Sequence, residues 1–61
     1  MYNELTVFLK NGSTLKFESI TELKINSSED SLNFYYVSMS TGKKKYATLL
    51  LYNITMYAYE V

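Results

Sequence analysis

Apolar and polar positions alternate along most of this 61-residue chain, in short runs rich in β-branched and aromatic residues. The first run covers about 2–10 and places Leu5, Val7 and Leu9 on one face. The second run starts near Ser13. A period of two is typical of a strand with one buried face. The pattern therefore predicts that the chain begins with a β-hairpin.

The turn of this hairpin contains an Asn-Gly pair, which is typical of a two-residue turn. A two-residue loop would place Val7 opposite Lys16, whereas a three-residue loop over 10–12 places Val7 opposite Leu15. Because a one-residue slip turns every side chain to the other face, the apolar match favours the longer loop. We predict a type I turn in which Gly12 adopts the left-handed conformation of a G1 bulge.

The next segment has two interpretations. Ser19 and Glu22 have the spacing of a capping box, which favours a helical turn. The alternation of Leu23 and Ile25, together with several β-branched residues, favours a strand. We expect a strand over 21–26 with a bend near Ser19.

The remaining elements follow from turn residues and alternation. They are a loop at 27–30, strands at about 32–40 and 43–52, a corner at 52–54 and a last strand at 55–60. The loop at 27–30 pairs Ile25 with Leu32. A two-residue turn at Thr41-Gly42 sets Leu32 opposite Leu51 and Phe34 opposite Leu49.

These registers agree on one apolar face, which we take as the core. Its members are Leu5, Val7, Leu9, Leu15, Phe17, Leu23, Ile25, Leu32, Phe34, Tyr36, Ala47, Leu49 and Leu51. Agreement between independently chosen turns supports the assignment. We expect a single all-β domain over 1–61, a hairpin-built antiparallel meander or small barrel of five to six strands.

A second face of the predicted hairpin at 32–52 is also apolar, although a face exposed to water is normally polar. With two residues of the last strand, it comprises Tyr35, Val37, Met39, Tyr46, Leu50, Tyr52, Tyr57 and Tyr59. Tyr and Met are enriched at protein interfaces, and a contiguous apolar patch usually marks a contact. We expect an interface with a partner protein or with a second copy of the chain. The alternative is that a curled barrel covers both faces.

The composition excludes several classes of chemistry. The chain has no cysteine and no histidine, which excludes disulfides, the common zinc sites and the usual general acid–base residue. Neither glycine lies in a phosphate-binding pattern. Glu29 and Asp30 fall short of a calcium-binding loop. We therefore expect a non-enzymatic protein with no cofactor and no metal ion.

The formal net charge is zero, and every cationic side chain is a lysine. The run Lys43-Lys44-Lys45 is a candidate contact for phosphate or an acidic partner, although three lysines also protect an edge strand. Nucleic-acid binding is the less favoured expectation because the chain has no arginine. No apolar run reaches the ~20 residues of a membrane span, and the first residues lack a signal-peptide pattern. We expect a cytoplasmic protein that does not bind membranes.

The hairpin sequence at 7–12, the bent second strand, the run at 46–54 and the closing strand resemble Sm-like and SH3-like small barrels. The glycine that Sm proteins place in their bent strand is replaced by Glu18-Ser19, and their RNA-contacting pattern is absent, so no RNA-binding residue is carried over.

The chain also resembles short β proteins encoded by phages and mobile elements of low-GC Gram-positive bacteria, anti-CRISPR proteins among them. That resemblance implies a protein-binding inhibitor of a host or defence protein. Our leading hypothesis is accordingly a non-enzymatic, oligomeric protein-binding module. The alternatives are a small-barrel single-stranded nucleic-acid binder and a structural virion or scaffold component.

Overall fold

The computed structural model describes residues 2–60. Along the chain it contains β1 (Tyr2–Leu9), β2 (Thr14–Asn26), β3 (Ser31–Val37), β4 (Lys44–Leu50), the 3₁₀ helix η1 (Leu51–Asn53) and β5 (Ile54–Tyr59). The strands pair antiparallel in the order β4-β3-β2-β1-β5. The all-β prediction is confirmed: the five strands form one open sheet whose edges are β4 and β5.

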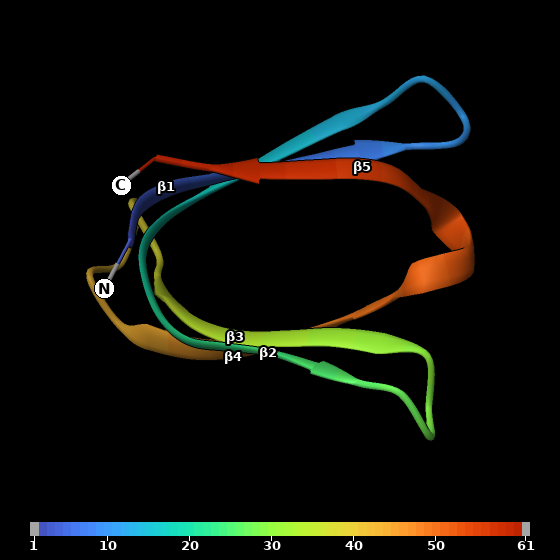
Figure 1. The fold of residues 1–61 in the computed structure, drawn as a ribbon. Helices are drawn as coiled ribbons and strands as arrows, with labels where there is room; N and C mark the ends of the chain where they lie inside the picture. The colour runs from blue at the N-terminus through green and yellow to red at the C-terminus, as the bar shows by residue number, and fades with distance from the viewer. Residues whose placement is uncertain (1, 61) are drawn as a thin grey trace.

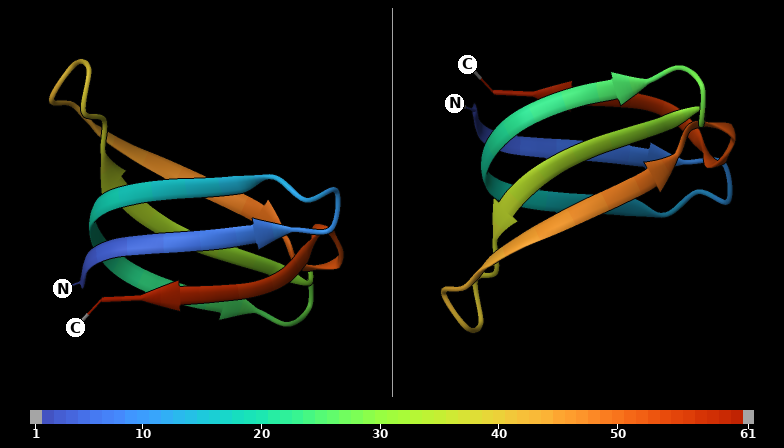
Figure 2. Two further views of the ribbon diagram at one scale, coloured as in Figure 1. Left: turned by 90° about the horizontal axis from the view of Figure 1, so that it is seen from above. Right: turned by 90° about the horizontal axis from the view of Figure 1, so that it is seen from below.

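The sheet curls until its two halves face each other across the core (Figure 1). β1, β5 and the first half of β2 form one layer, and the second half of β2 forms the other layer with β3 and β4. Seen from above and below, the strands of the two layers run obliquely to each other (Figure 2). η1 carries the chain from β4 back to β5.

A bend in β2 produces this curl. Ser19 and Glu22 both have a φ of 54°, and the register between β2 and β3 shifts near each of them. A residue inserted into one strand of an antiparallel pair forms a β-bulge, which bends the strand and increases its twist. The expected bend near Ser19 is confirmed, and residues 19–26 are strand, so two predicted strands are a single bent one.

The first turn has the predicted three-residue loop. Leu9 donates to the Ser13 carbonyl at 2.9 Å, and the Gly12 N–H donates to the Leu9 carbonyl at 3.0 Å. Gly12 has a φ of 91°, as the G1 bulge requires. The register places Val7 opposite Leu15, as expected from the apolar match.

The predicted two-residue turn at Thr41-Gly42 is too short by two residues. Four residues, 39–42, separate Ser38 from Lys43, because the Gly42 N–H donates back to the Ser38 carbonyl at 2.7 Å and closes a single helical turn. Leu32 therefore lies opposite Leu49 rather than Leu51. Since side chains alternate with a period of two, a shift of two residues changes the neighbours but leaves each side chain on its predicted face.

The core lies inside the curl. Leu5, Val7, Ile20, Leu32 and Phe34 are fully buried. The partly buried side chains packed against them are Leu9, Leu15, Phe17, Leu23, Tyr36, Ala47, Leu49, Leu51, Ile54 and Tyr57.

Two core predictions need correction. Ile25 is 53% exposed, because it lies at the end of β2 where the strand leaves the curl for the turn at 27–30. The predicted core omits Ile20, because strict alternation from the inward-facing Phe17 places the Ile20 side chain on the outer face. The bulge at Ser19 inserts one residue and turns Ile20 inward.

Phe34 belongs to an aromatic cluster in this core, with its ring 4.9 Å from that of Phe17 in an edge-to-face arrangement. We predict that Phe34→Ala lowers the free energy of unfolding by about 3–5 kcal/mol, because it removes a buried ring and leaves a cavity. A domain of this size has roughly 3–9 kcal/mol in total, so the urea midpoint should fall sharply or the variant should be unfolded. Met39→Ala is the control, since Met39 is 78% exposed. Equal midpoints for the two variants would contradict the assigned core.

Candidate protein-binding surface

The outer side of the β3–β4 hairpin carries a compact aromatic patch. Tyr35 lies directly opposite Tyr46 in the register, and their ring centroids are 4.8 Å apart. The Lys44 ammonium lies over the Tyr35 ring at 4.8 Å from its centroid, and Val37 lies opposite Lys44. We call Tyr35, Val37, Lys44 and Tyr46 the tyrosine patch.

The patch is held by backbone pairing rather than by burial. Successive residues of a strand point to opposite faces, so the buried Phe34 directs Tyr35 outward. Tyr46 is brought opposite Tyr35 by the four-residue loop at 39–42. Tyr46 stays 58% exposed, whereas Tyr35 is half-buried beneath its neighbours.

A polar network interrupts the predicted second face. The Thr48 hydroxyl donates to Asn33 Oδ1 at 2.8 Å, and Asn33 Nδ2 donates to the hydroxyl of the buried Ser31 at 3.0 Å. These residues lie between the tyrosine patch and Leu50, which pairs with Ser31. Leu50 therefore shares the outer face of β4 but is separated from the patch.

The other predicted interface residues lie elsewhere. Met39 is in the exposed loop after β3, and Tyr52 is in η1 with 63% of its surface exposed. Tyr57 packs against the core, and its pairing with Val7 gives it the core-facing position in β5. Tyr59 pairs with Leu5 on the same side of β5 as Tyr57 and is 43% exposed. The sheet thus brings together Tyr35, Val37 and Tyr46 but not the tyrosines of the last strand.

The side chains of Lys43, Lys44 and Lys45 do not share one surface. Lys43 ends the loop, and Lys44 and Lys45 begin β4 on opposite faces because consecutive residues of a strand alternate. Of the three, Lys44 belongs to the tyrosine patch, with its ammonium over the Tyr35 ring. All three side chains are exposed.

A shallow hollow of about 200 Å³ lies beside the tyrosine patch, between it and β2. Glu22 and Lys24 line its far side, and Asn33, Tyr35 and Tyr46 complete it. Glu22 and Lys24 place opposite charges beside the patch. The predicted register, with Ile25 opposite Leu32, already places Glu22 and Tyr35 on the same outer face, but this rim was not identified from the sequence as part of a site.

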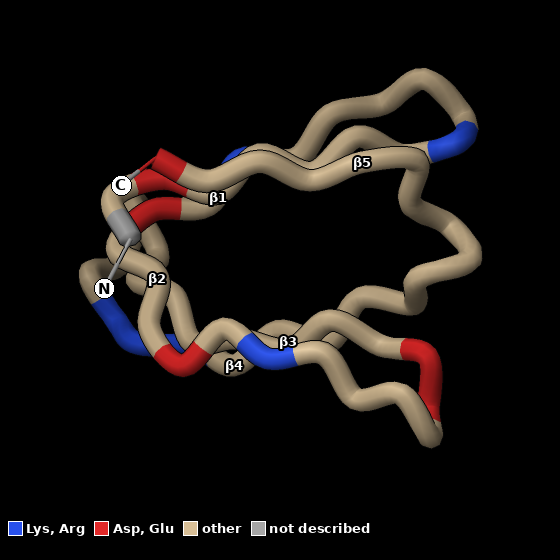
Figure 3. Tube along the Cα trace, viewed as in Figure 1, with Lys and Arg blue, Asp and Glu red and all other residues tan. Residues whose placement is uncertain are grey.

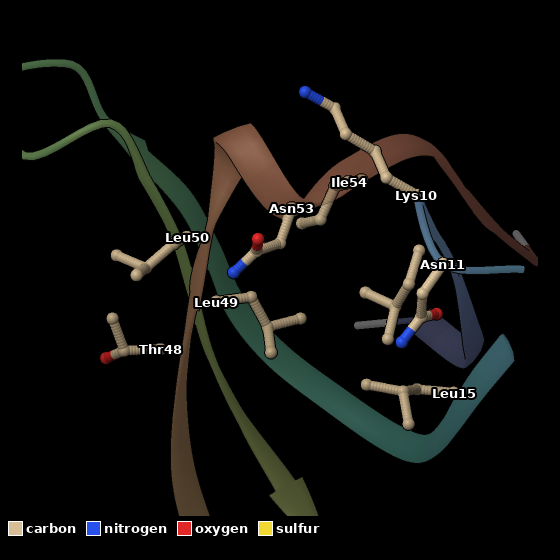
Figure 4. Close-up of a pocket in the computed structure, with 9 residues that line it drawn as sticks. Lys10, Asn11, Leu15, Thr48, Leu49, Leu50, Asn53 and Ile54 are labelled. Atoms are coloured by element: carbon tan, nitrogen blue, oxygen red, sulfur yellow. The ribbon is translucent and has the colours of Figure 1, made fainter. Parts of the chain in front are cut away.

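A larger cavity of about 570 Å³ opens at the end of the curl between the first hairpin, the end of β4 and η1 (Figure 4). Its floor is aliphatic, with Leu15 and Leu49 facing the space, and Asn11 and Asn53 lie on its rim. The Lys10 side chain points away from it. The lining provides no acid–base pair or nucleophile with a base, so it offers no catalytic arrangement.

Within 2–60, no three Asp or Glu side chains gather closely enough to hold a metal ion. The same part of the chain has no helix long and apolar enough to cross a membrane.

The chain matches no protein-family model, and no curated protein or solved structure is significantly similar to it. The case for a function therefore depends on the chemistry of its surface.

Thr21 lies opposite Tyr35, and its buried hydroxyl has no hydrogen-bond partner among the residues described. We predict that Thr21→Val raises the free energy of unfolding by about 1 kcal/mol, because it removes an unsatisfied buried hydroxyl while keeping the β-branched shape. Urea unfolding measures the change. Thr14→Val, at an exposed β2 position, should shift the midpoint little. Destabilisation by Thr21→Val would show that the hydroxyl is satisfied in solution.

Proposed function

We propose that this chain is a non-enzymatic protein-binding module that contacts its partner through the tyrosine patch. One observation carries the proposal: the rings of Tyr35 and Tyr46 contact each other on the outer face of the β3–β4 hairpin, outside the aromatic cluster of the core. Tyr46 keeps 58% of its surface exposed. An aromatic pair outside the core stabilises little until a partner removes it from water.

Tyrosine suits this role physically. Its ring supplies a large apolar area with few rotatable bonds, and its hydroxyl remains able to hydrogen-bond at the rim. The Lys44 ammonium beside the rings adds a positive charge to the patch. The chemistry best matched to the patch is therefore a protein surface that presents a carboxylate next to an apolar side chain.

Such a module acts by occupying a surface of its partner. That mode of action fits the resemblance to phage-encoded inhibitors of host or defence proteins. The proposal requires no deep pocket and no catalytic residue, in keeping with the chemistry of this chain.

We predict that Tyr46→Ser lowers partner affinity by about 10-fold or more, because truncating a central interface tyrosine typically costs about 2 kcal/mol. Immobilised protein and quantitative mass spectrometry of bound bacterial proteins identify the partner, and titration of that purified partner gives the dissociation constant. Tyr52→Ser is the matched control, with the same chemical change at a similarly exposed site in η1. Equal losses of partner affinity for the two variants would show that the partner does not bind through the tyrosine patch.

A second candidate is single-stranded nucleic-acid binding, and the contact between Lys44 and the Tyr35 ring favours it. An exposed aromatic ring beside a cation can stack on a base while the cation contacts phosphate. Against it stand the zero net charge and the carboxylate of Glu22 on the rim. The protein-binding function therefore remains the better supported proposal.

For a nucleic-acid binder we predict that the logarithm of the binding constant for oligothymidine falls linearly with the logarithm of salt concentration. The slope should be no steeper than about −2, since the run supplies at most three lysines and each phosphate contact contributes about −0.7 for a single strand. Lys44→Ala should make that slope shallower by roughly 0.7. Fluorescence anisotropy measures both, and an oligonucleotide affinity that does not change with salt eliminates this candidate.

A further inference from the structure

The outer edge of β4 exposes backbone groups that no described strand covers. In an antiparallel pair only alternate residues exchange hydrogen bonds with the neighbouring strand. The Ser38 N–H donates to the Lys43 carbonyl, and the Leu51 N–H donates to the Asp30 carbonyl, so odd-numbered residues face β3. The residues that direct N–H and C=O groups away from the sheet are Lys44, Tyr46, Thr48 and Leu50.

This edge lacks the usual protection against strand pairing. Natural edge strands are blunted by charges, prolines or bulges. The lysines guard only the first two residues of β4, and the stretch 46–50 contains no charge and no proline. The β3–β4 register also runs without a shift from Val37 to Ser31, so no bulge twists the edge away. An uncharged edge without a bulge is a template for pairing with another strand.

We propose that the second strand is β4 of another copy of this chain, paired antiparallel about a twofold axis at Ala47. In this register Tyr46 exchanges hydrogen bonds with Thr48 of the partner subunit, and Lys44 with Leu50 of the partner subunit. All four outward-facing residues of each strand are then satisfied. The inference goes beyond the proposed function and does not depend on it.

Ala47 is suited to the axis. Residues that lie between hydrogen-bonded pairs approach most closely in an antiparallel ladder, at about 4.5 Å between Cα atoms. On the axis Ala47 meets its own copy at this narrow position, and its methyl group is the smallest side chain in β4. A register centred on Tyr46 or Thr48 would instead place a larger side chain next to itself.

The charges favour the same arrangement. The basic run at the start of β4 and the acidic turn after β2 lie at opposite ends of the lower layer (Figure 3). A twofold axis between them brings the basic end of each copy to the acidic end of the other. Lys44 would lie opposite Leu50 of the partner subunit, and Leu50 pairs with Ser31, the residue after Asp30. With strands about 4.8 Å apart, that carboxylate lies about two strand spacings, or ~10 Å, from Lys44, which is close enough for the opposite charges to attract across the contact.

Pairing β4 with itself also closes the assembly. A twofold contact uses the same edge of both copies and ends at two chains. A contact between β4 of one copy and β5 of another would instead add copies head to tail. Such an assembly leaves a free β4 edge at one end and a free β5 edge at the other, unless it closes into a ring. In the twofold dimer the two outer faces lie on the same side, which places two tyrosine patches on one surface.

Thr48→Pro tests the edge directly, with Thr48→Val as the matched control. Proline removes the outward N–H, is tolerated on edge strands and breaks no backbone hydrogen bond to β3. Both changes remove the Thr48 hydroxyl, so they differ in the backbone group. We expect sedimentation to give twice the 7.1 kDa chain mass for the natural protein and for Thr48→Val, and a single chain mass for Thr48→Pro. A natural protein that stays monomeric at high concentration overturns the proposal.

Amide hydrogen exchange of the natural protein keeps the test decisive if the proline variant does not fold. In the dimer, the Tyr46 and Thr48 amides should be protected together with those of Ala47 and Leu49. Alternating protection, with Tyr46 and Thr48 fast, means that the edge is free and the proposal is wrong. An isotope-mixed sample should also show contact between Ala47 residues of the two copies. An assembly without that contact would point to pairing with β5 and would equally overturn it.

These results are separable from those for the proposed function. Tyr46→Ser changes a side chain on the outer face but keeps its backbone groups, so it should remain dimeric while losing the partner. Thr48→Pro leaves both tyrosine rings in place. Loss of dimer without loss of partner binding, or the reverse, therefore identifies which of the two ideas fails.

Discussion

The fold depends on the bend of β2, because this one strand belongs to both layers of the curled sheet. Ser19 and Glu22 each adopt a positive φ, and each adds one residue to β2 relative to β3. The left-handed conformation costs roughly 1–2 kcal/mol per residue. Burial of Ile20 contributes about 1.5–3 kcal/mol and offsets much of that cost. Without the bend the sheet would be flat, and its apolar face would remain in water.

Curling the sheet gives a chain of this size one core between its two layers and no further element of the described chain outside them (Figure 1). The inside of the curl accepts the aromatic cluster of Phe17, Phe34 and Tyr36. The outside of β3 and β4 has no element above it, yet Tyr35 and Tyr46 meet there. A small domain covers its interior first, so an aromatic pair left outside is the feature that most needs a functional explanation.

β4 offers two surfaces that do not compete. Its side chains stand perpendicular to the sheet, whereas its free N–H and C=O groups point along the sheet plane. Tyr46 contributes its ring to the outer face and its backbone to the edge. A protein partner on the tyrosine patch and a second copy on the edge can therefore bind at the same time, and pairing of the edges would present the patch twice.

Much of this architecture could be predicted from the sequence, because a period of two ties each side chain to a face. The length of the first turn followed from matching Val7 with Leu15. The two-residue error in the turn between β3 and β4 changed which residues lie opposite each other, but it left every side chain on its predicted face of the sheet. The candidate site was only partly predictable. Tyr35, Val37 and Tyr46 gather as expected on one outer face, but Tyr57 packs against the core.

The sequence by itself thus determined that the chain is all-β, where its strands lie and which residues share a face within each hairpin. Only the tertiary structure decided which faces meet. The bulge at Ser19 turns Ile20 inward, and the pairing of β5 with β1 turns Tyr57 inward. The physical reason is that local alternation does not encode how many residues a bend inserts or which distant strand a strand joins. Those choices depend on burial summed over the whole sheet.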